Sequence, residues 1–276
     1  MGLDLTTRLS LRDGNSVPQL GLGVYKVPDA DTPAVVTAAL DAGYRHVDTA
    51  TLYGNEHGVG EALRASAVPR AQVFLTSKVW NDDHGFGATL RAFDASLRRM
   101  RLEALDLYLI HWPCPRQDLY VPTWRALIRL QQEGRVASIG VSNFHASHIR
   151  RIADETGVRP AVNQVELHPW LQQRELREFH AAHGIATEAW SPLARGRAVD
   201  DPVLSAIGQR HSVSAAQVAI RWHLQQGNVV IPKSVTASRI PSNADVYGFE
   251  LDADELAEIA ALDAGERTGR NPDDVG

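Results

Sequence analysis

Eight short apolar runs, each followed by a segment with helical spacing, constrain the fold of this chain more than any other feature. The runs span residues 20–24, 46–49, 73–78, 105–111, 136–141, 161–165, 185–190 and 229–232. Near-continuous apolar strands that alternate with helices are typical of a parallel sheet covered by helices on its outer face. Eight such units in 276 residues favour a single (β/α)8 barrel, the TIM-barrel class, over an open sheet.

The segments between these runs carry apolar residues three and four positions apart, as amphipathic helices do. They span residues 32–41, 87–100, 121–133, 145–155 and 172–183. A further helix is expected to begin at Asn55 or Glu56, two more within residues 201–226, and another over 254–262. Residues 9–17 alternate around an Asp-Gly pair, which predicts an N-terminal β-hairpin. Because no linker interrupts the pattern, residues 1–276 are expected to form one domain.

A doubly wound sheet is the main alternative, and it makes a demand that the sequence does not meet. A dinucleotide-binding fold of that class opens with Gly-x-Gly-x-x-Gly between its first strand and first helix. Gly21 and Gly23 lack the third glycine, and Gly58 and Gly60 lie within a helical pattern. A nicotinamide cofactor would therefore bind this chain without that motif.

Composition argues against several classes of function. A net charge of -5 argues against a nucleic-acid or anionic-membrane surface. The single cysteine, Cys114, excludes an internal disulfide framework and a multi-cysteine zinc site. Since no apolar run reaches membrane-spanning length and residues 1–10 lack the pattern of a secretory signal, a cytoplasmic protein is expected.

Polar side chains stand where the predicted strands end, which is where a barrel of this kind carries its chemistry. Asp48 ends the second strand, with Tyr53 in the loop after it. Lys78 ends the third strand and His111 the fourth. The later strands end in Ser142, Asn143, Gln164, Glu166, Trp190, Ser191, Lys233 and Ser234. Ionisable groups at three adjacent strand ends indicate one constellation.

These groups suit proton transfer to a carbonyl oxygen. A buried lysine beside a phenol lowers the pKa of the phenol, and an aspartate keeps the lysine charged and in position. Tyr53 would then be an acid near neutral pH, and His111 could hydrogen-bond the oxygen that Tyr53 protonates. Taken singly, each residue also has a structural interpretation: an ion pair of Asp48 with Lys78 at the rim, a core histidine and wall packing. Their grouping favours catalysis, because perturbed groups cluster at functional sites.

Three long segments of the chain read Gly-Tyr-Arg-His-Val-Asp-Thr-Ala over 43–50, Leu-Tyr-Leu-Ile-His-Trp-Pro over 107–113, and Ile-Pro-Lys-Ser-Val over 231–235. These segments resemble the three signature motifs of the aldo-keto reductase family. Residues 140–144 and 163–169 add supporting stretches in the same order. Residues 53–56, 80–83 and 189–193 are similar to the bacterial 2,5-diketo-D-gluconate reductase branch.

This resemblance implies a catalytic tetrad of Asp48, Tyr53, Lys78 and His111, with Tyr53 as the general acid. It implies an NADPH-dependent oxidoreductase that reduces aldehydes and ketones to alcohols by hydride transfer, either like 2,5-diketo-D-gluconate reductase or as a broad carbonyl reductase. A non-catalytic NADP(H)-binding barrel with a regulatory role is the alternative.

The resemblance also implies which residues bind NADPH. A nicotinamide would stack on Trp190, and a flat aromatic ring against a flat ring is physically sensible. The 2'-phosphate would be held by Lys233, Ser234 and Arg239, which makes NADPH the expected cofactor over NADH. The implied contacts are Ser142, Asn143, Gln164, Trp190, Ser191, Leu193, Lys233, Ser234, Val235, Arg239 and Asn243.

Three aromatic residues are expected to line the substrate pocket: Tyr25, Trp80 and Trp112. Such a lining suits the apolar side of a small carbonyl compound, and wall packing without ligand contact is the alternative. We expect no nucleic-acid or membrane partner, and a monomer.

A metal-dependent hydrolase would need a His-x-His at the first strand or a His-Glu-x-x-His helix, and neither is present. We therefore expect no metal. The histidine pairs His180 with His183 and His145 with His148 are interpreted as solvated helix faces. Cys114 is expected in an accessible loop, but without a base to activate it.

Overall fold

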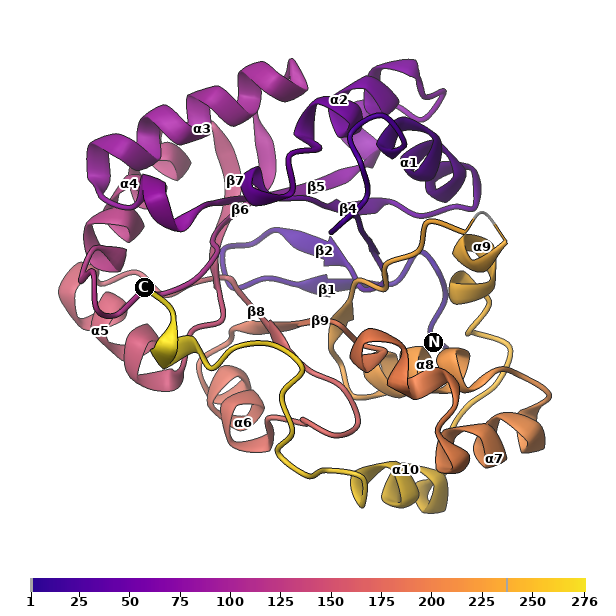
Figure 1. Ribbon diagram of the computed structural model, residues 1–276. Helices are drawn as coiled ribbons and strands as arrows, with labels where there is room; N and C mark the ends of the chain where they lie inside the picture. The colour runs from indigo at the N-terminus through magenta and orange to yellow at the C-terminus, as the bar shows by residue number, and fades with distance from the viewer. Residues whose placement is uncertain (1, 237) are drawn as a thin grey trace.

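The computed structural model describes residues 2–236 and 238–276. Within these residues, eight parallel strands form one sheet in which each strand pairs with the next along the chain (Figure 1). The strands are β3 (Leu22–Gly23), β4 (His46–Asp48), β5 (Phe74–Val79), β6 (Leu105–Ile110), β7 (Val136–Ser142), β8 (Val162–Glu166), β9 (Ala186–Trp190) and β10 (Val229–Val230). All eight lie within a residue or two of the apolar runs that predict them.

The first and last strands also pair, which closes the sheet. Leu20 forms a parallel bridge with Val230, and Gly23 forms another with Lys233. The backbone N–H of Gly21 donates to the carbonyl of Val230 at 2.9 Å, and the N–H of Val230 donates to Gln19 at 2.9 Å. These contacts confirm the predicted (β/α)8 barrel class.

Helices cover the outside of the barrel (Figure 1). They are α1 (Thr32–Asp41), α2 (Glu56–Ala65), α3 (Phe86–Met100), α4 (Tyr120–Gln132), α5 (Ala146–Thr156), α6 (Arg174–Ala182), α7 (Pro202–His211), α8 (Ala215–Gln225), α9 (Arg239–Ala244) and α10 (Ala253–Ala260). Capping explains several starts: the Ser214 side chain accepts from the Gln217 N–H before α8, and Asp252 accepts from the Glu255 N–H before α10. The predicted pair of helices before the last strand is confirmed as α7 and α8.

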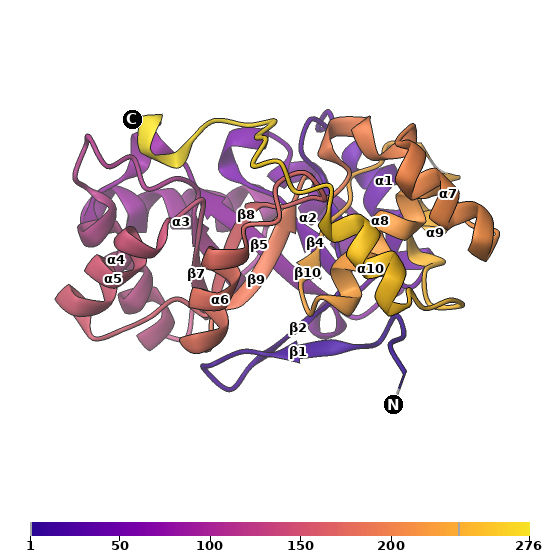
Figure 2. The ribbon, with the colours of Figure 1, turned by 90° about the horizontal axis from the view of Figure 1, so that it is seen from below.

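Short 3₁₀ turns complete the connections: η1 (Thr51–Tyr53), η2 (Arg70–Gln72), η3 (Asn81–Asp83), η4 (Ala194–Val199) and η5 (Pro272–Asp274). The N-terminal hairpin is also present, as β1 (Arg8–Ser10) and β2 (Ser16–Pro18). Leu11 and Val17 of this hairpin region pack with Phe74, Leu107 and Val162, which point into the barrel. The hairpin therefore covers the N-terminal end of the barrel, and the C-terminal segment lies at the opposite end (Figure 2).

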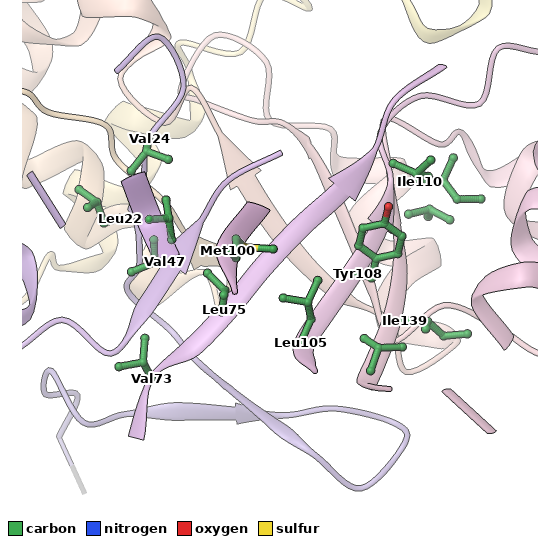
Figure 3. Packing of buried hydrophobic residues seen from close by; sticks show 14 of the residues in the cluster. Leu22, Val24, Val47, Val73, Leu75, Met100, Leu105, Tyr108, Ile110 and Ile139 are labelled. Atoms are coloured by element: carbon green, nitrogen blue, oxygen red, sulfur yellow. The ribbon is translucent and has the colours of Figure 1, made fainter. Parts of the chain in front are cut away.

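Alternation along the strands divides the core into two layers. Leu75 of β5 and Tyr108 of β6 point outward and join Met100 of α3 in the cluster between sheet and helices (Figure 3). Their neighbours Phe74 and Leu107 belong to the inner cluster instead. Successive side chains of a strand point to opposite faces of the sheet. Residues of β5 that lie an even number of positions after Phe74 therefore face the inside of the barrel. Among the helices of residues 2–236 and 238–276, none combines the length and the apolar character that a membrane span requires.

Candidate functional site

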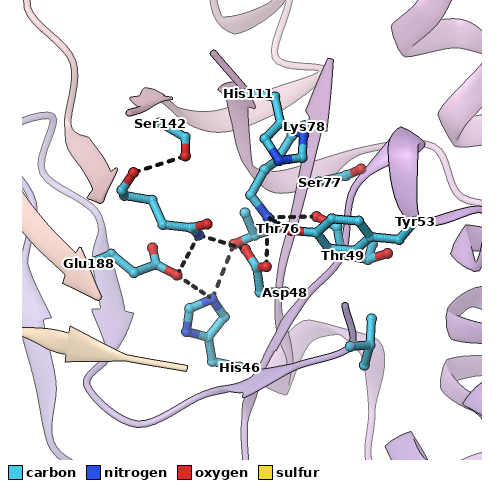
Figure 4. Close-up of polar contacts among 12 residues, drawn as sticks. His46, Asp48, Thr49, Tyr53, Thr76, Ser77, Lys78, His111, Ser142 and Glu188 are labelled. Carbon is cyan, nitrogen blue, oxygen red and sulfur yellow. Dashed lines mark hydrogen bonds and ion pairs between the residues drawn. The ribbon is translucent and has the colours of Figure 1, made fainter. Parts of the chain in front are cut away.

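The ends of β4 and β5 and the turn η1 bring Asp48, Lys78 and Tyr53 together. Asp48 is in register with Thr76 on the neighbouring β5, and Lys78 lies two residues further along, on the same face. The Lys78 Nζ lies 2.6 Å from Asp48 Oδ1 and also donates to the carbonyl of Thr49 at 3.0 Å. It lies 3.4 Å from the hydroxyl of Tyr53 (Figure 4). The sequence predicted this grouping from two strand ends and the loop that follows the first of them.

His111, just beyond the end of β6, joins the group through its ring. Its ring centroid lies 5.7 Å from that of Tyr53 and 5.1 Å from that of Trp80, both edge-on. Burial, helped by the nearby Lys78 and His84, lowers the pKa of His111 well below its ordinary value. The ring is therefore neutral at physiological pH and has one N–H to donate.

The pKa of Tyr53 differs from the expectation. Burial raises it to about 12, and the charge of Lys78 opposes that rise without reversing it. The predicted lowering of this pKa was therefore wrong, because desolvation of the phenolate outweighs attraction by the ammonium. Tyr53 still holds its proton at neutral pH, which a proton donor requires.

Lys78 is buried and remains charged. Burial alone would lower the pKa of Lys78, but Asp48 and Tyr53 raise it above its ordinary value. Since a buried ammonium needs a close anion, the ion pair with Asp48 is what allows a lysine in the barrel interior. The side chains of both residues are almost completely buried.

Sequence reasoning missed two members of this polar cluster, Glu188 and His46. The amide of Gln164 donates to Asp48 Oδ2 at 2.8 Å and to Glu188 Oε1 at 3.0 Å. His46 Nε2 lies 4.0 Å from the same oxygen of Glu188 (Figure 4). A signal was available, because Glu188 is the charged residue of β9 and lies two residues before Trp190, so the two side chains share a face.

The residues expected at a nicotinamide lie side by side at the ends of β7, β8 and β9. Ser142 Oγ donates to the carbonyl of Gln164 at 2.9 Å, and the Asn143 N–H donates to the same carbonyl at 2.9 Å. The indole N–H of Trp190 donates to Asn143 Oδ1 at 2.8 Å, which fixes the ring. Trp190 itself is half-buried, so part of the ring is open to a ligand. Ser191 and Leu193 follow it and are also half-buried.

The residues expected at a phosphate follow β10 and reach into α9. Lys233, Val235 and Arg239 are exposed, whereas Ser234 and Asn243 are buried. Among residues 2–236 and 238–276, neither Lys233 nor Arg239 forms an ion pair with a carboxylate. Two cations without a partner in the same segment fit an anionic group such as a phosphate.

Two of the three predicted pocket residues belong to one aromatic row. Tyr25 packs against Tyr53 with ring centroids 5.0 Å apart, and Trp80 packs against His111. Trp112 is half-buried and makes none of these ring contacts within the described chain. The row therefore places aromatic surface on both sides of the tyrosine and histidine.

The C-terminal segment crosses the same end of the barrel. The buried Glu166 accepts from the N–H and the hydroxyl of Thr268 at 2.6 and 2.5 Å, and from the N–H of Gly269 at 3.1 Å. A Cβ at Gly269 would lie 2.6 Å from the ring of Trp190, so only glycine allows this approach. The segment is thus anchored beside the indole.

Three expectations about other residues need correction. Cys114 is buried, and burial raises the pKa of its thiol to about 11, so the accessible-loop prediction was wrong. His180 and His148 are also buried, which contradicts the solvated-face interpretation. His180 hydrogen-bonds Asn163 and Thr187 inside the structure. Within the described residues, no group of three or more His, Cys, Asp or Glu side chains is arranged to hold a metal.

Cavities elsewhere in the molecule do not contain the predicted residues. One of about 690 Å³ lies beside the hairpin and is lined by Arg177, Trp222 and Gln226 among others. Another of about 750 Å³ lies at the start of β6 and is lined by Arg70 and Asp106 among others. Arg70 and Asp106 form an ion pair at 2.7 Å in the second cavity, but the residues lining the two cavities include no lysine, tyrosine or histidine like those at the C-terminal ends of the strands.

Comparisons with known proteins agree with this site. Residues 19–264 match the model of the Aldo/keto reductase family. An aldo-keto reductase of Mycolicibacterium smegmatis is 53% identical over 268 residues, which are 97% of this chain and 98% of that protein. Methylglyoxal reductase DkgA of Salmonella typhimurium is 51% identical over 272 residues, 98% of each. A crystal structure of a Gox0644 variant in complex with NADPH has a TM-score of 0.95 at 51% identity, covering 98% of this chain and 99% of that chain. This chain therefore belongs to the aldo/keto reductase family.

Proposed function

We propose that this chain reduces aldehydes and ketones to alcohols with NADPH, and that Tyr53 donates the proton. The observation that carries the proposal is the position of Lys78, whose Nζ lies 2.6 Å from Asp48 and 3.4 Å from the Tyr53 hydroxyl. An ammonium beside a phenol favours the phenolate that remains after the proton leaves. Structural packing alone gives no reason to bury a charged lysine at this point.

The four residues divide the chemistry of protonation among them. Tyr53 gives its hydroxyl proton to the carbonyl oxygen as that oxygen gains negative charge. The neutral His111 donates a hydrogen bond to the same oxygen and orients the carbonyl. Lys78 stabilises the phenolate, and Asp48 holds Lys78 in place. NADPH, when bound, supplies the hydride that goes to the carbonyl carbon, so hydride and proton together convert a carbonyl to an alcohol.

The residues around the site fit this cofactor. The half-exposed indole of Trp190 offers a flat surface to a nicotinamide, and Ser142, Asn143 and Gln164 stand beside it. Lys233 and Arg239 supply positive charge for a 2'-phosphate, which only NADPH carries. A complex of Gox0644 with NADPH supports the assignment at 51% identity.

Small dicarbonyl compounds are the proposed substrate class. Support comes from the DkgA relatives, which are methylglyoxal reductases, and from the aromatic row formed by Tyr25 and Trp80. Sugar-derived diketones of the 2,5-diketo-D-gluconate kind are larger members of the same class.

The test is NADPH oxidation, followed by its absorbance, with methylglyoxal, a simple aldehyde and 2,5-diketo-D-gluconate. We expect turnover with at least one of them and weaker turnover when NADH replaces NADPH. Binding of NADPH without turnover on any carbonyl would instead support the regulatory barrel. Sedimentation of the same preparation tests the further proposal that the chain is a monomer.

A further inference from the structure

The side-chain amide of Gln164 is held by two carboxyl groups rather than one. Its Nε2 donates to Asp48 Oδ2 at 2.8 Å and to Glu188 Oε1 at 3.0 Å, so both amide hydrogens are used. The Oε1 of Gln164 accepts no hydrogen bond within residues 2–236 and 238–276, and it is not fully buried. The amide oxygen is therefore the atom that Gln164 offers to a ligand.

The charge of Asp48 fixes the direction of this amide. The reverse orientation would place the amide oxygen against the Asp48 carboxylate, where two acceptors would face each other. Asp48 thus determines that the amide nitrogen of Gln164, and not its oxygen, faces the carboxylate. A single hydrogen bond leaves the amide free to rotate about it, and the second bond, to Glu188, removes that freedom.

Glu188 can hold the amide of Gln164 in this way only if it does not compete with Asp48 for the ion pair with Lys78. It is fully buried, and the charged or titratable groups that face it are Asp48 and His46 on β4 and Lys78 on β5. Burial lowers the pKa of His46 to about 3, so this ring is neutral, and the cation that acts on Glu188 is Lys78. Since Lys78 is already paired with Asp48, burial and the charge of Asp48 keep Glu188 protonated, raising its pKa to about 8.

We infer that Glu188 is a positioning residue, which holds the second amide hydrogen of Gln164 and so directs the oxygen of Gln164 toward the carboxamide of a bound nicotinamide. The inference rests on the proposed function for the identity of that ligand. Glu188 does not touch the reacting atoms itself. Its Oε2 is buried and accepts no hydrogen bond in the described structure, so this oxygen can carry the proton of a neutral acid.

A pH effect follows from the same geometry. When Glu188 loses its proton, a second negative charge appears beside Asp48, close to Lys78. That charge disfavours a phenolate at Tyr53, so the rate of carbonyl reduction should fall as the pH rises through about 8. Tyr53 and Lys78 titrate well above this range and do not produce the same decline.

Two substitutions separate the effect of the hydrogen bond between Glu188 and Gln164 from the effect of the ionisation of Glu188. Glu188→Gln keeps an acceptor for Gln164 but cannot ionise, whereas Glu188→Leu removes the acceptor. We expect Glu188→Leu to weaken NADPH binding about 5- to 10-fold, as the loss of one buried hydrogen bond does. Glu188→Gln should bind NADPH within about twofold of the unmodified chain and lose the decline in rate between pH 7 and 9. Dissociation constants come from quenching of tryptophan fluorescence by NADPH, without any turnover.

Glu255→Gln is the matched control, because Glu255 is a buried carboxylate in α10 that contacts Arg210 and His211, far from Gln164. It should change neither NADPH binding nor the pH profile. Circular dichroism checks that Glu188→Leu folds. If Glu188→Leu binds NADPH as tightly as the unmodified chain, or if Glu188→Gln keeps the alkaline decline, the inference is overturned while the proposed function stands. If no carbonyl is reduced but Glu188→Leu still weakens NADPH binding, the proposed function fails and the positioning role remains.

Discussion

At the scale of single residues, the site depends on a proton donor that keeps its proton until the substrate needs it. Burial raises the pKa of Tyr53 to about 12, and Lys78 lies 3.4 Å from its hydroxyl. A phenol with this environment is a poor acid in the resting protein. It becomes a better one when the acceptor oxygen gains negative charge, because the proton then moves toward that charge.

Replacing Tyr53 with phenylalanine tests this view. The ring and its packing against Tyr25 remain, but the hydroxyl is lost. Removing a general acid costs about 10²- to 10⁴-fold, so we expect kcat to fall by that factor while NADPH binding changes less than about twofold. Steady-state kinetics and fluorescence titration measure the two quantities. Undiminished kcat would show that the proton comes from another group.

The ion pair of Lys78 with Asp48 gives a stability prediction. Lys78→Met leaves the Asp48 carboxylate buried without its cation, and breaking a buried pair in this way costs about 3–5 kcal/mol. Urea unfolding at pH 7 measures the change. Arg129→Ala is the control, because it breaks an exposed pair between Arg129 of α4 and Glu133 just after that helix, which is worth less than about 1 kcal/mol. Equal losses in the two variants would contradict the assigned importance of burial.

The sequence predicts the members of this cluster better than their protonation. Asp48, Lys78 and His111 were found because each ends a strand, a property that strand periodicity reveals. The pKa of Tyr53 was mispredicted because attraction by Lys78 is visible in the sequence, whereas the depth of burial is not. Glu188 was missed for a related reason: its link to Asp48 runs through Gln164 across the barrel, and only a closed sheet brings β4 and β9 that near.

At the scale of elements, the segment from β10 into α9 carries the cations that distinguish the two nicotinamide cofactors. Lys233 and Arg239 are both exposed and make no ion pair within the described residues. Arg239→Ala should therefore raise the KM for NADPH by about 10-fold, the value of one charge-assisted contact, and leave the KM for NADH unchanged. Kinetics with both cofactors give the ratio, and an unaltered ratio would argue against this segment as the phosphate site.

The contact between α2 and α3 depends on a glycine. A Cβ at Gly60 would lie 2.2 Å from the carbonyl oxygen of Met100 and 2.6 Å from its Cα. Gly60→Ala should therefore separate the two helices and destabilise the chain by about 1–3 kcal/mol. Gly87→Ala on the exposed side of α3 meets only the end of Arg91 and should stabilise by about 0.5–1 kcal/mol. Thermal unfolding distinguishes the opposite signs, and a stable Gly60→Ala variant would refute the close approach.

Element boundaries were largely readable from the sequence. Thr32–Asp41 has the predicted bounds, and Glu56 begins α2 as expected. Gly58 and Gly60 of α2 do not belong to a dinucleotide-binding motif. Gly60 instead allows α2 to pack closely against Met100 of α3. The path of the C-terminal segment was not predictable, since it is fixed by hydrogen bonds from Thr268 and Gly269 to Glu166, about a hundred residues earlier.

At the scale of the whole molecule, buried neutral histidines make stability depend on pH. Burial lowers the pKa of His46 and of His223 to about 3. Between that value and 6.5, the unfolded chain binds protons that the folded chain refuses, so stability is complete above pH 6.5 and is lost as the pH falls. Well below pH 6.5, each of these histidines lowers the free energy of unfolding by about 1.4 kcal/mol for each pH unit.

Urea unfolding at pH 7, 6 and 5 measures this dependence. We expect the midpoint to fall with each step, and to fall less in a variant in which His223 is replaced by Gln. His57→Gln is the control, because His57 is exposed and lies at a surface aspartate, Asp29. A midpoint that is constant from pH 7 to 5 would contradict the neutral burial of these rings.

The barrel class was predictable because eight apolar runs leave few other arrangements for 276 residues. What the runs do not specify is how far each strand extends: β3 and β10 are only two residues long. Their pairing is completed by the bridges of Leu20 with Val230 and of Gly23 with Lys233. The assignment of residues 1–276 to one domain stays a prediction.

The seam between these two strands sets an order of events during synthesis. The first strand, β3, needs residues 229–233 as its neighbour on one side. Its backbone groups on that side therefore stay unpaired while the ribosome is still making the earlier repeats. The nascent chain therefore carries an open edge until translation has passed residue 233, and such edges attract other chains. Lys233, proposed to bind phosphate, forms part of that seam. The ability to bind NADPH should thus arise late, when the first and last strands pair after most of the polypeptide has been synthesised.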